Sequence, residues 1–376
     1  VEDRLDLGDV VVVGGLRYDW YHTRASRPFA TDTAGNTYPF PRVSTMPGFD
    51  PASPTAHYVR DQSHGYLSPH VQVSFPVTDR TNFRLSYSHQ VQAPDFGLLL
   101  GGINIDLGNT NTNQVFGSDL DFGKTIAFEF GIRHAFSDDM VLDVAAYNKD
   151  NLSNAAGRLV SRFDPLRENN QNIRVMTNAD FGNTRGVDVR LDRRFGNFFN
   201  GTVSYTYQQS KNTGSDPDTY LDFGSRVLNQ VSGGNQPPPQ AVLPTDFNRP
   251  HTLAAAASLT FPNDWNEGRT IGSIFENVGV FATFRYTSGT PYTPCAPGVG
   301  DEDVISGENC NNFFPEPLNS SRLPSFKSLD LRLTKGFALG GLDLTGYVEA
   351  RNLLNFKNII QVFTTTNDVV NARERD

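Results

Sequence analysis

The stretch SLDLRLTKGFALGGLDLTGYVEAR, residues 328–351, decides the fold of this chain. Leu329, Leu331 and Leu333 alternate with Asp330, Arg332 and Thr334, and a similar alternation resumes between Leu342 and Arg351. Successive side chains of a β-strand point to opposite faces, whereas the 3.6-residue period of a helix would mix the two sets. The stretch therefore predicts two amphipathic strands joined by a short turn at residues 338–341.

The same period of two recurs along the rest of the chain. Val187, Val189 and Leu191 alternate with Asp188 and Arg190, for example. The pattern predicts about eleven strands. They cover residues 9–22, 69–77, 82–92, 123–136, 139–150, 176–195, 199–211, 247–261, 278–290, 324–336 and 342–354.

The expected connections alternate between short and long. Short turns fall at 78–81, 137–139, 196–198 and 338–341, a medium one at 263–277, and long loops near 23–68, 93–122, 151–175, 212–246 and 291–323. Short periplasmic turns and long extracellular loops are typical of an antiparallel transmembrane β-barrel, whose strands of about ten residues span the membrane. The sequence therefore predicts an all-β fold of this class. A soluble β-sandwich is the alternative, and it predicts shorter strands and a polar outer face.

Composition narrows the choice of function. The chain has 376 residues, a formal net charge of −9 and 28 phenylalanines. This apolar content argues against wholesale disorder, and the acidic balance without a basic cluster argues against nucleic-acid binding. Aromatic residues gather near the expected strand ends, where they suit a membrane interface or simply reflect strand propensity. They include Tyr18, Trp20, Tyr21, Tyr205, Tyr207, Phe284, Tyr286 and Tyr292.

Seven stretches together resemble the barrel of TonB-dependent outer-membrane receptors, and most of all the receptors with a carboxypeptidase-regulatory-like domain. They are GLRYDWY (15–21), SFPVTDRTNFRLSYSH (74–89), KTIAFEFGIRHAFSDDMVLDVAAYNKD (124–150), NADFGNTRGVDVRLDRR (178–194), RPHTL (249–253), YTSGTPYTP (286–294) and YVEARNLLNFKN (347–358). One departure is DLDFGKT, residues 119–125, where the family more often has a Leu-Lys-Pro-Glu-like turn.

The resemblance implies a barrel of 22 strands with a plug in its lumen. About eleven strands are expected here, an odd number, although bacterial barrels have an even number. We therefore expect residues 1–376 to be part of such a barrel, with the plug domain, the TonB box and the closing C-terminal strand absent from this sequence. An open half-barrel of this kind would expose two sheet edges, so it is not expected to be stable alone in water.

The polar faces of the strands hold the best functional candidates. Charges that face a barrel interior can contact a plug, line a water-filled path or set selectivity. Their alternative role is to hold the wall together by ion pairs between strands. The candidates are Asp188, Arg190, Asp192, Asp330, Arg332, Glu349 and Arg351.

Other residue groups suggest less. Cys295 and Cys310 share one expected loop, and an outer-membrane setting favours a disulfide between them. The acidic loop residues fit no defined calcium motif and are interpreted as solvated charge; they are Asp216, Asp218, Asp222, Asp301, Glu302, Asp303 and Glu308. His57, His64 and His70 have no zinc-site spacing. With neither a GxSxG elbow, an HExxH motif nor a phosphate-binding loop, the sequence predicts no enzyme, no metal site and no cofactor.

The resemblance implies energy-coupled import of a scarce nutrient through the outer membrane of a Gram-negative bacterium. The expected partners are outer-membrane lipid, a small extracellular ligand and the TonB complex, the last through the plug region. Siderophore, cobalamin, glycan and peptide ligands all remain open. An outer-membrane structural or adhesive barrel is the second hypothesis, since long loops rich in Asn, Gly and Pro suit a surface protein. A soluble all-β binding or hydrolytic protein is the third.

Overall fold

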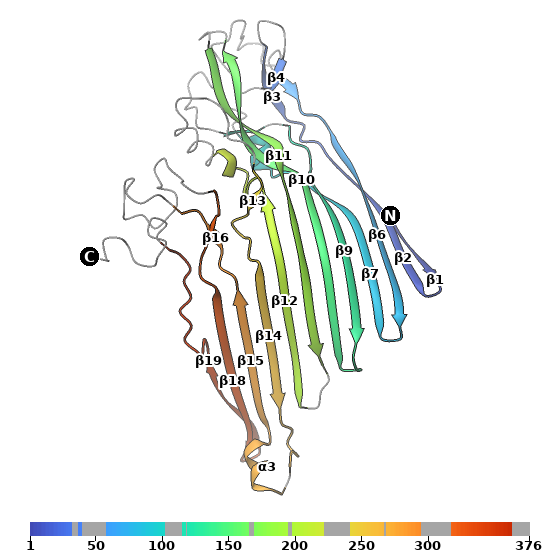
Figure 1. Cartoon of the computed structure of the whole chain (residues 1–376), viewed down its shortest axis with the longest axis vertical. Coiled ribbons are helices and arrows are strands. Elements are labelled where there is room, and N and C mark those ends of the chain that lie inside the picture. Colours follow the sequence, from blue (N-terminus) through green and yellow to red (C-terminus); the bar gives the residue numbers. More distant parts are fainter. Residues whose placement is uncertain are drawn as a thin grey trace, which may run out of the picture.

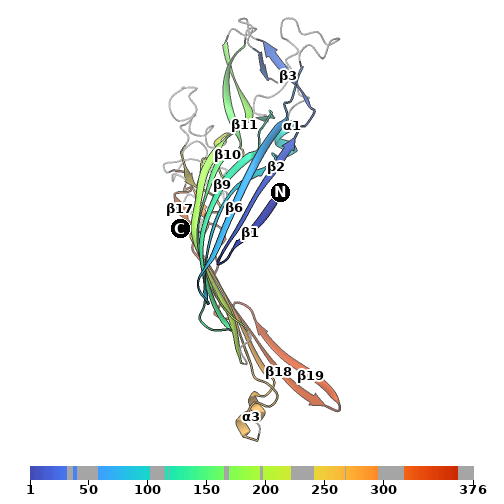
Figure 2. The same cartoon turned by 90° about the vertical axis from the view of Figure 1, so that its right-hand side faces the viewer.

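The chain forms one long, twisted antiparallel sheet (Figures 1 and 2). The computed structural model describes residues 1–31, 37–39, 58–101, 115–117, 119–164, 169–194, 198–221, 241–266, 268–294 and 317–362. The main path of the sheet follows chain order: β1 (Glu2–Leu7), β2 (Val10–Tyr21), β6 (His64–Thr78), β7 (Thr81–Gln92), β9 (Gly123–Ala135), β10 (Met140–Asp164), β11 (Asn169–Arg193), β12 (Phe199–Asn212), β14 (His251–Thr260), β15 (Val278–Thr287), β18 (Phe326–Leu339) and β19 (Leu342–Ala350).

Shorter elements gather at the end of the sheet that carries the long connections (Figure 1). The strands β8 (Val115–Phe116) and β13 (Leu243–Pro244) attach to β11 and β12. Small separate sheets are formed by β3 (Ser26–Thr31), β4 (Thr37–Pro39) and β5 (Tyr58–Arg60), and by β16 (Pro291–Tyr292) and β17 (Ser321–Arg322). Two helices are described, α1 (Phe96–Leu100) and α3 (Thr270–Phe275), and α3 lies at the opposite end. No helix among the described residues is long and apolar enough to cross a membrane.

All eleven expected strands are present, and the structure corrects two details. The odd count is wrong, because β1 adds a twelfth strand to the described path. Its first residues, Glu2, Asp3 and Arg4, are consecutive charges that hide the alternation. The expected loop at 151–175 is also wrong over most of its length, because β10 and β11 extend through it as a long hairpin. Its sequence shows no sustained apolar–polar alternation, and the backbone pairing of the two strands makes it a sheet.

The register aligns the side chains of all strands into apolar and polar rows. One apolar row reads Leu85, Phe130, Ala146, Val187, Tyr207 from β7 to β12. No second layer of the described chain covers this apolar face, whose large side chains stay exposed, among them Leu16, Trp20, Phe128, Leu191, Val203, Leu333 and Val348. A soluble sheet buries such a face, so this exposure contradicts the soluble all-β hypothesis and fits a sheet that faces lipid.

The buried apolar core lies at the end that carries the long connections. Leu99, Leu120 and Met176 are each at most 4% exposed, and Tyr21 packs against them while its hydroxyl donates to the carbonyl of Leu120. Asp95 begins α1 by accepting a hydrogen bond from the backbone N–H of Gly97 at 2.6 Å. The loops are therefore anchored to the wall by their own small core, while the strands below present their apolar face to the surroundings.

The β18–β19 turn gives a local prediction. Gly340 and Gly341 both have positive φ, 58° and 82°, as the favoured two-residue hairpin turn requires. Gly341→Val should therefore destabilise this hairpin by about 1–2 kcal/mol, the usual cost of a left-handed conformation for a residue with a side chain. Hydrogen exchange of the β19 amides measures the loss. The control is Gly346→Ala inside β19, where an added Cβ has its nearest neighbour at 3.6 Å; equal effects of the two changes would contradict the prediction.

Candidate functional site

The register places the seven polar candidates on one face of the sheet. Asp192 and Asp330 share a row that reads Asp192, Thr202, Ala256, Thr283, Asp330 from β11 to β18. Asp188 and Arg190 follow from Asp192 by the period of two, and Arg332 pairs with Glu349 one row further. Arg351 lies just after β19 and donates from Nε to Glu349 at 2.8 Å. The polar face is therefore continuous from β11 to β19.

Each of these charged groups is satisfied close to its own position. Two ion pairs join residues two apart in sequence: Arg190 with Asp192 at 2.7 Å and Arg351 with Glu349 at 2.8 Å. Three further groups have other partners: Thr206 donates to Asp188 at 2.6 Å, Ser328 donates to Asp330 at 2.8 Å, and the Arg332 guanidinium lies 4.6 Å from the ring centre of Tyr347. The two ion pairs therefore neutralise charge within a strand and do not join neighbouring strands.

A cross-strand ion-pair network exists elsewhere on this face, between residues that the sequence did not single out. Arg84 of β7 makes two hydrogen bonds of 2.8 Å to Asp143 of β10 and one of 3.3 Å to Glu129 of β9. Its side chain crosses β9 over Gly131, where a Cβ would lie 2.7 Å from Arg84 Nε. The feature that marks this network is a glycine, Gly131, directly opposite an arginine, Arg84. The sequence contains both residues, but only the strand register shows that they are opposite each other.

The polar face is hollowed where small side chains meet. The hollow has a volume of about 340 Å³, and its lining includes Arg190, Asp192, Thr202, Ala256, Ser258 and Thr283. Alanine, serine and threonine leave space above the wall that longer side chains would fill. Arg190 and Asp192 supply a charged border, while Phe281 and the alanines make most of the lining apolar.

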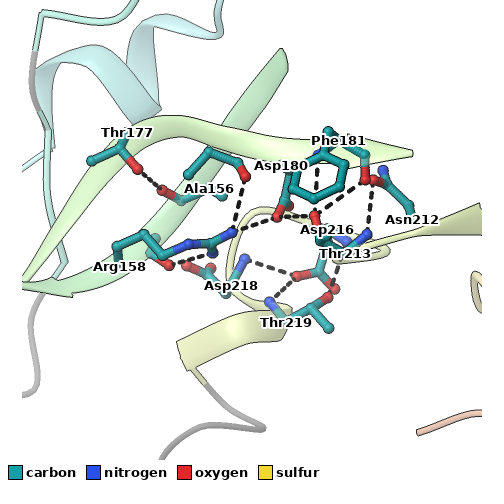
Figure 3. A network of polar contacts seen from close by, with 12 residues as sticks. Ala156, Arg158, Thr177, Asp180, Phe181, Asn212, Thr213, Asp216, Asp218 and Thr219 are labelled. Atoms are coloured by element: carbon teal, nitrogen blue, oxygen red, sulfur yellow. Dashed lines mark hydrogen bonds and ion pairs between the residues drawn. The ribbon is translucent and has the colours of Figure 1, made fainter. Parts of the chain in front are cut away.

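A buried polar cluster holds the loops at the outer end of the wall (Figure 3). Arg158 of β10 donates from Nη2 to Asp180 of β11 at 2.8 Å, and Thr213 donates to the same carboxylate oxygen at 2.8 Å. The Arg158 guanidinium lies 4.0 Å from the ring centre of Tyr220. Arg158 and Asp180 are 9% and 3% exposed. We call Arg158, Asp180, Thr213 and Tyr220 the outer clamp.

The outer clamp fixes the segment 213–221 onto the long hairpin. Gly157 donates its backbone N–H to Pro217 at 2.7 Å, and Leu221 packs so closely that a Cβ on Gly157 would lie 2.4 Å from it. Asp216 accepts from the backbone N–H of Asp218 at 2.9 Å and of Thr219 at 2.8 Å, which shapes the turn (Figure 3). Burial raises the pKa of Tyr220, and the nearby charge of Arg158 partly offsets that rise. A loop that sequence alone leaves unstructured is thus tied to the wall.

A second polar cluster ties residues 119–124 to the strands. His64 of β6 lies 2.9 Å from Asp119 and 3.6 Å from Asp121, while Lys124 donates to Asp121 at 2.5 Å. Asn178 of β11 accepts from the backbone N–H of Asp121 and donates to its carbonyl. Burial alone would raise the pKa of Asp121, but the Lys124 ammonium and a backbone N–H of Phe122 bring it below its usual value. This cluster therefore bonds residues 119–121 to strands β6, β9 and β11.

The remaining expected residues divide between described and undescribed parts of the chain. His70 lies inside β6, 3.2 Å from Glu2 of β1, and Asp216 and Asp218 shape the turn already described. Within the described residues, no group of three or more His, Cys, Asp or Glu side chains is arranged to hold a metal ion. The other residues lie outside the described part; they are Cys295, Cys310, His57, Asp222, Asp301, Glu302, Asp303 and Glu308.

Comparison with known proteins agrees with this architecture. Residues 1–353 match the family model described as TonB dependent receptor-like, beta-barrel. No curated protein sequence matches the chain. Similar solved structures include the siderophore receptor PiuA from Acinetobacter baumannii, with 13% identity and a TM-score of 0.50, covering 96% of this chain and 39% of that one.

Two further structures show the same likeness of fold. The outer membrane transporter YddB from Escherichia coli has 11% identity and a TM-score of 0.52, covering 94% of this chain and 49% of that one. A mutant of the ferric enterobactin receptor from Pseudomonas aeruginosa, in complex with enterobactin, has 13% identity and a TM-score of 0.52, covering 97% and 42%. The chain thus spans less than half the length of these three proteins.

Proposed function

Because this chain belongs to the family of TonB-dependent receptor β-barrels, we propose that it forms wall and outer loops of a receptor that imports a scarce nutrient. Members of this family lie in the outer membrane of Gram-negative bacteria. The observation that supports the proposal is the two-faced sheet: an uncovered apolar face and a continuous polar face extend across the same strands. Such a wall separates lipid from an aqueous lumen.

In our proposal, transport needs a plug and a TonB contact in addition to the barrel strands of this chain. The similar structures are more than twice as long as the region they share with this chain, which supports a longer receptor around residues 1–376. In our proposal that receptor supplies a plug and a TonB contact, and energy from the inner membrane moves the plug after a ligand binds outside. The outer clamp and the polar cluster of His64, Asp119, Asp121 and Lys124 contribute by holding the loops in a shape that captures the ligand.

The seven polar-face residues have a proposed place in this mechanism. In this proposal they face the lumen, and Arg190 and Asp192 border the hollow beside Ala256 and Thr283. Because they are four carboxylates and three guanidinium groups, and two ion pairs form among them, they present a polar surface with little net charge. Such a surface suits contact with a plug or a hydrated path more than tight capture of one charged ligand.

Uptake by cells that express the whole gene tests the transport function. Radiolabelled ferric siderophores, cobalamin, an oligosaccharide and an oligopeptide are offered to cells with and without TonB. The proposal expects uptake of one ligand class that is lost when TonB is deleted. Uptake of that ligand that persists without TonB contradicts the mechanism. Failure of every class, with the folded barrel present in the outer membrane, favours the structural or adhesive alternative.

Paired cysteine variants test which face meets the lumen. Asp188 and Val189 are neighbours in β11 that face opposite sides, in rows with Thr206 and Tyr205 respectively. Asp188→Cys in permeabilised cells should react with a polar, membrane-impermeant maleimide severalfold faster than Val189→Cys, after correction for the parent protein. Equal labelling, or faster labelling at Val189→Cys, would overturn the lumen assignment.

A further inference from the structure

The β14–β15 connection differs from the other turns at its end of the sheet. The turns Gly8–Asp9, Asp79–Arg80 and Gly340–Gly341 need two residues each, whereas residues 261–277 join β14 to β15 and contain α3 (Figure 1). Two residues suffice to connect neighbouring antiparallel strands. The additional residues of 261–277, which we call the aromatic turn, are therefore not required by the sheet.

The aromatic turn has a folded apolar centre. Phe261 lies 4.9 Å from Trp265 and 5.5 Å from Phe275 between ring centres, and Trp265 lies 5.9 Å from Phe275. The rings of Phe261 and Trp265 meet edge to face at 69°. Such pairs contribute about 0.5–1.5 kcal/mol each beyond the burial of their area. Phe198 from the adjacent β11–β12 turn extends the cluster, 6.5 Å from Phe261.

One face of α3 is apolar and exposed. Ile271, Ile274 and Phe275 are 49%, 60% and 38% exposed. Their spacing of three and four residues places them on a single face of the helix. A turn surrounded by water gains nothing from presenting two isoleucines and a phenylalanine, because apolar area in contact with water is unfavourable.

The aromatic turn is joined to the apolar face of the sheet. Lys335 pairs with Val278 in the register, in the same apolar series as Leu331, Leu333 and Val280. Its ammonium donates to the carbonyl of Glu276 at 2.6 Å and to that of Ile274 at 3.3 Å, at the C-terminal end of α3. Phe261 also continues the apolar series of β14 two residues beyond Leu259.

Exposed apolar side chains continue beside this junction. Phe337, Leu339 and Leu342 at the end of the β18–β19 hairpin are 48%, 64% and 64% exposed. Phe337 and Leu339 follow Lys335 on the same face of β18 by the period of two. The exposed side chains of α3 are thus continuous with the face that meets lipid.

We propose that the aromatic turn is an interfacial anchor that inserts the apolar face of α3 among the phospholipids of the inner leaflet of the outer membrane. Tryptophan and short amphipathic helices favour the boundary between headgroups and acyl chains. Lys335 keeps its aliphatic stem along apolar surface and its ammonium at the more polar level, as lysine does at such boundaries. The exposed Arg269 just before α3 suits the same headgroup layer. The anchor depends on the membrane location of the barrel and not on the identity of the imported ligand.

Photo-cross-linking in outer membranes of cells expressing the whole gene tests this anchor. The photoreactive residue p-benzoylphenylalanine replaces Ile274, and as the matched control it replaces Asp79 of the two-residue β6–β7 turn. The anchor predicts phospholipid adducts on the folded barrel, with a yield severalfold higher at position 274 than at position 79. Ile271 is a second probe position should the Ile274 variant fail to fold.

Three results would overturn the anchor. Adducts at position 274 with a periplasmic protein would mean that α3 is a protein docking surface. Equal phospholipid yields at positions 274 and 79 would mean that no selective insertion occurs. An absence of adducts on a folded barrel would mean that the helix projects into water. Because nutrient uptake is measured separately, none of these results decides the transport proposal.

Discussion

Asp180→Ala should release the outer clamp, with a loss of local stability of about 3–5 kcal/mol, the usual result of removing one partner from a buried ion pair. Asp180 is 3% exposed and accepts hydrogen bonds from both Arg158 and Thr213. Its removal takes away the carboxylate that Arg158 contacts at 2.8 Å, while the guanidinium stays buried. Tyr220 remains beside that guanidinium, but a ring face does not replace a carboxylate.

Hydrogen exchange gives the measurement, because the clamp holds particular amides. Gly157 donates to Pro217, and Thr213 donates from its backbone N–H to Phe181 at 3.0 Å, so both amides should lose protection in Asp180→Ala. The control is Asp6→Ala, which removes the exposed Arg4–Asp6 pair, 3.2 Å apart, and should cost at most about 1 kcal/mol. No greater loss in Asp180→Ala than in this control would show that the clamp does not hold the loop.

The double variant Asp180→Ala with Arg158→Met separates charge from packing. Methionine keeps much of the apolar stem beside Tyr220 but removes the buried positive charge. Since both charges must lose water when they are buried, deleting both is expected to restore a large part of the stability lost in Asp180→Ala. A double variant less protected than Asp180→Ala would mean that Arg158 stabilises the loop mainly through its other contacts, the carbonyls of Gly157 and Ala179.

Ala255→Arg should impair assembly of the barrel, with a cost of about 2–4 kcal/mol when the arginine lies near the middle of the lipid. Ala255 belongs to the row Val203, Ala255, Phe284, Leu329, which is apolar throughout. The arginine would replace a methyl group among side chains that offer no hydrogen-bond acceptor. The folded fraction is measured from the heat-dependent shift of the barrel on a denaturing gel, after extraction from outer membranes.

Ala256→Arg is the matched control for this substitution. It is the next residue of the same strand, and its row contains Thr202, Thr283, Asp192 and Asp330. An arginine there enters the polar face beside the hollow and should leave the folded fraction nearly unchanged. Equal loss from both variants would mean that the size of the arginine side chain, and not its exposure to lipid, explains the effect. A greater loss from Ala256→Arg would contradict the assignment of the two faces.

The period of two was enough to predict the strands and their two faces. Leu329, Leu331 and Leu333 alternate with Asp330 and Arg332, and covalent geometry alone sends such neighbours to opposite sides of a strand. The same reasoning placed the seven polar candidates on polar faces. It failed where alternation is hidden by consecutive charges, as at Glu2–Arg4 in β1, or is not sustained, as in the sequence of the outer hairpin of β10 and β11.

The sequence did not predict which residues of neighbouring strands contact each other. The run Ala254–Ala257 carries no polarity difference, so only its register with β12 and β15 shows that Ala255 and Ala256 face opposite sides. Arg84 reaches Asp143 because Gly131 of the strand between them leaves room. Arg158 meets Asp180 and Tyr220 only when a long hairpin and a loop fold together. Period within a strand follows from bond geometry, but proximity between strands depends on register and on how the chain folds back, which only the tertiary structure decides.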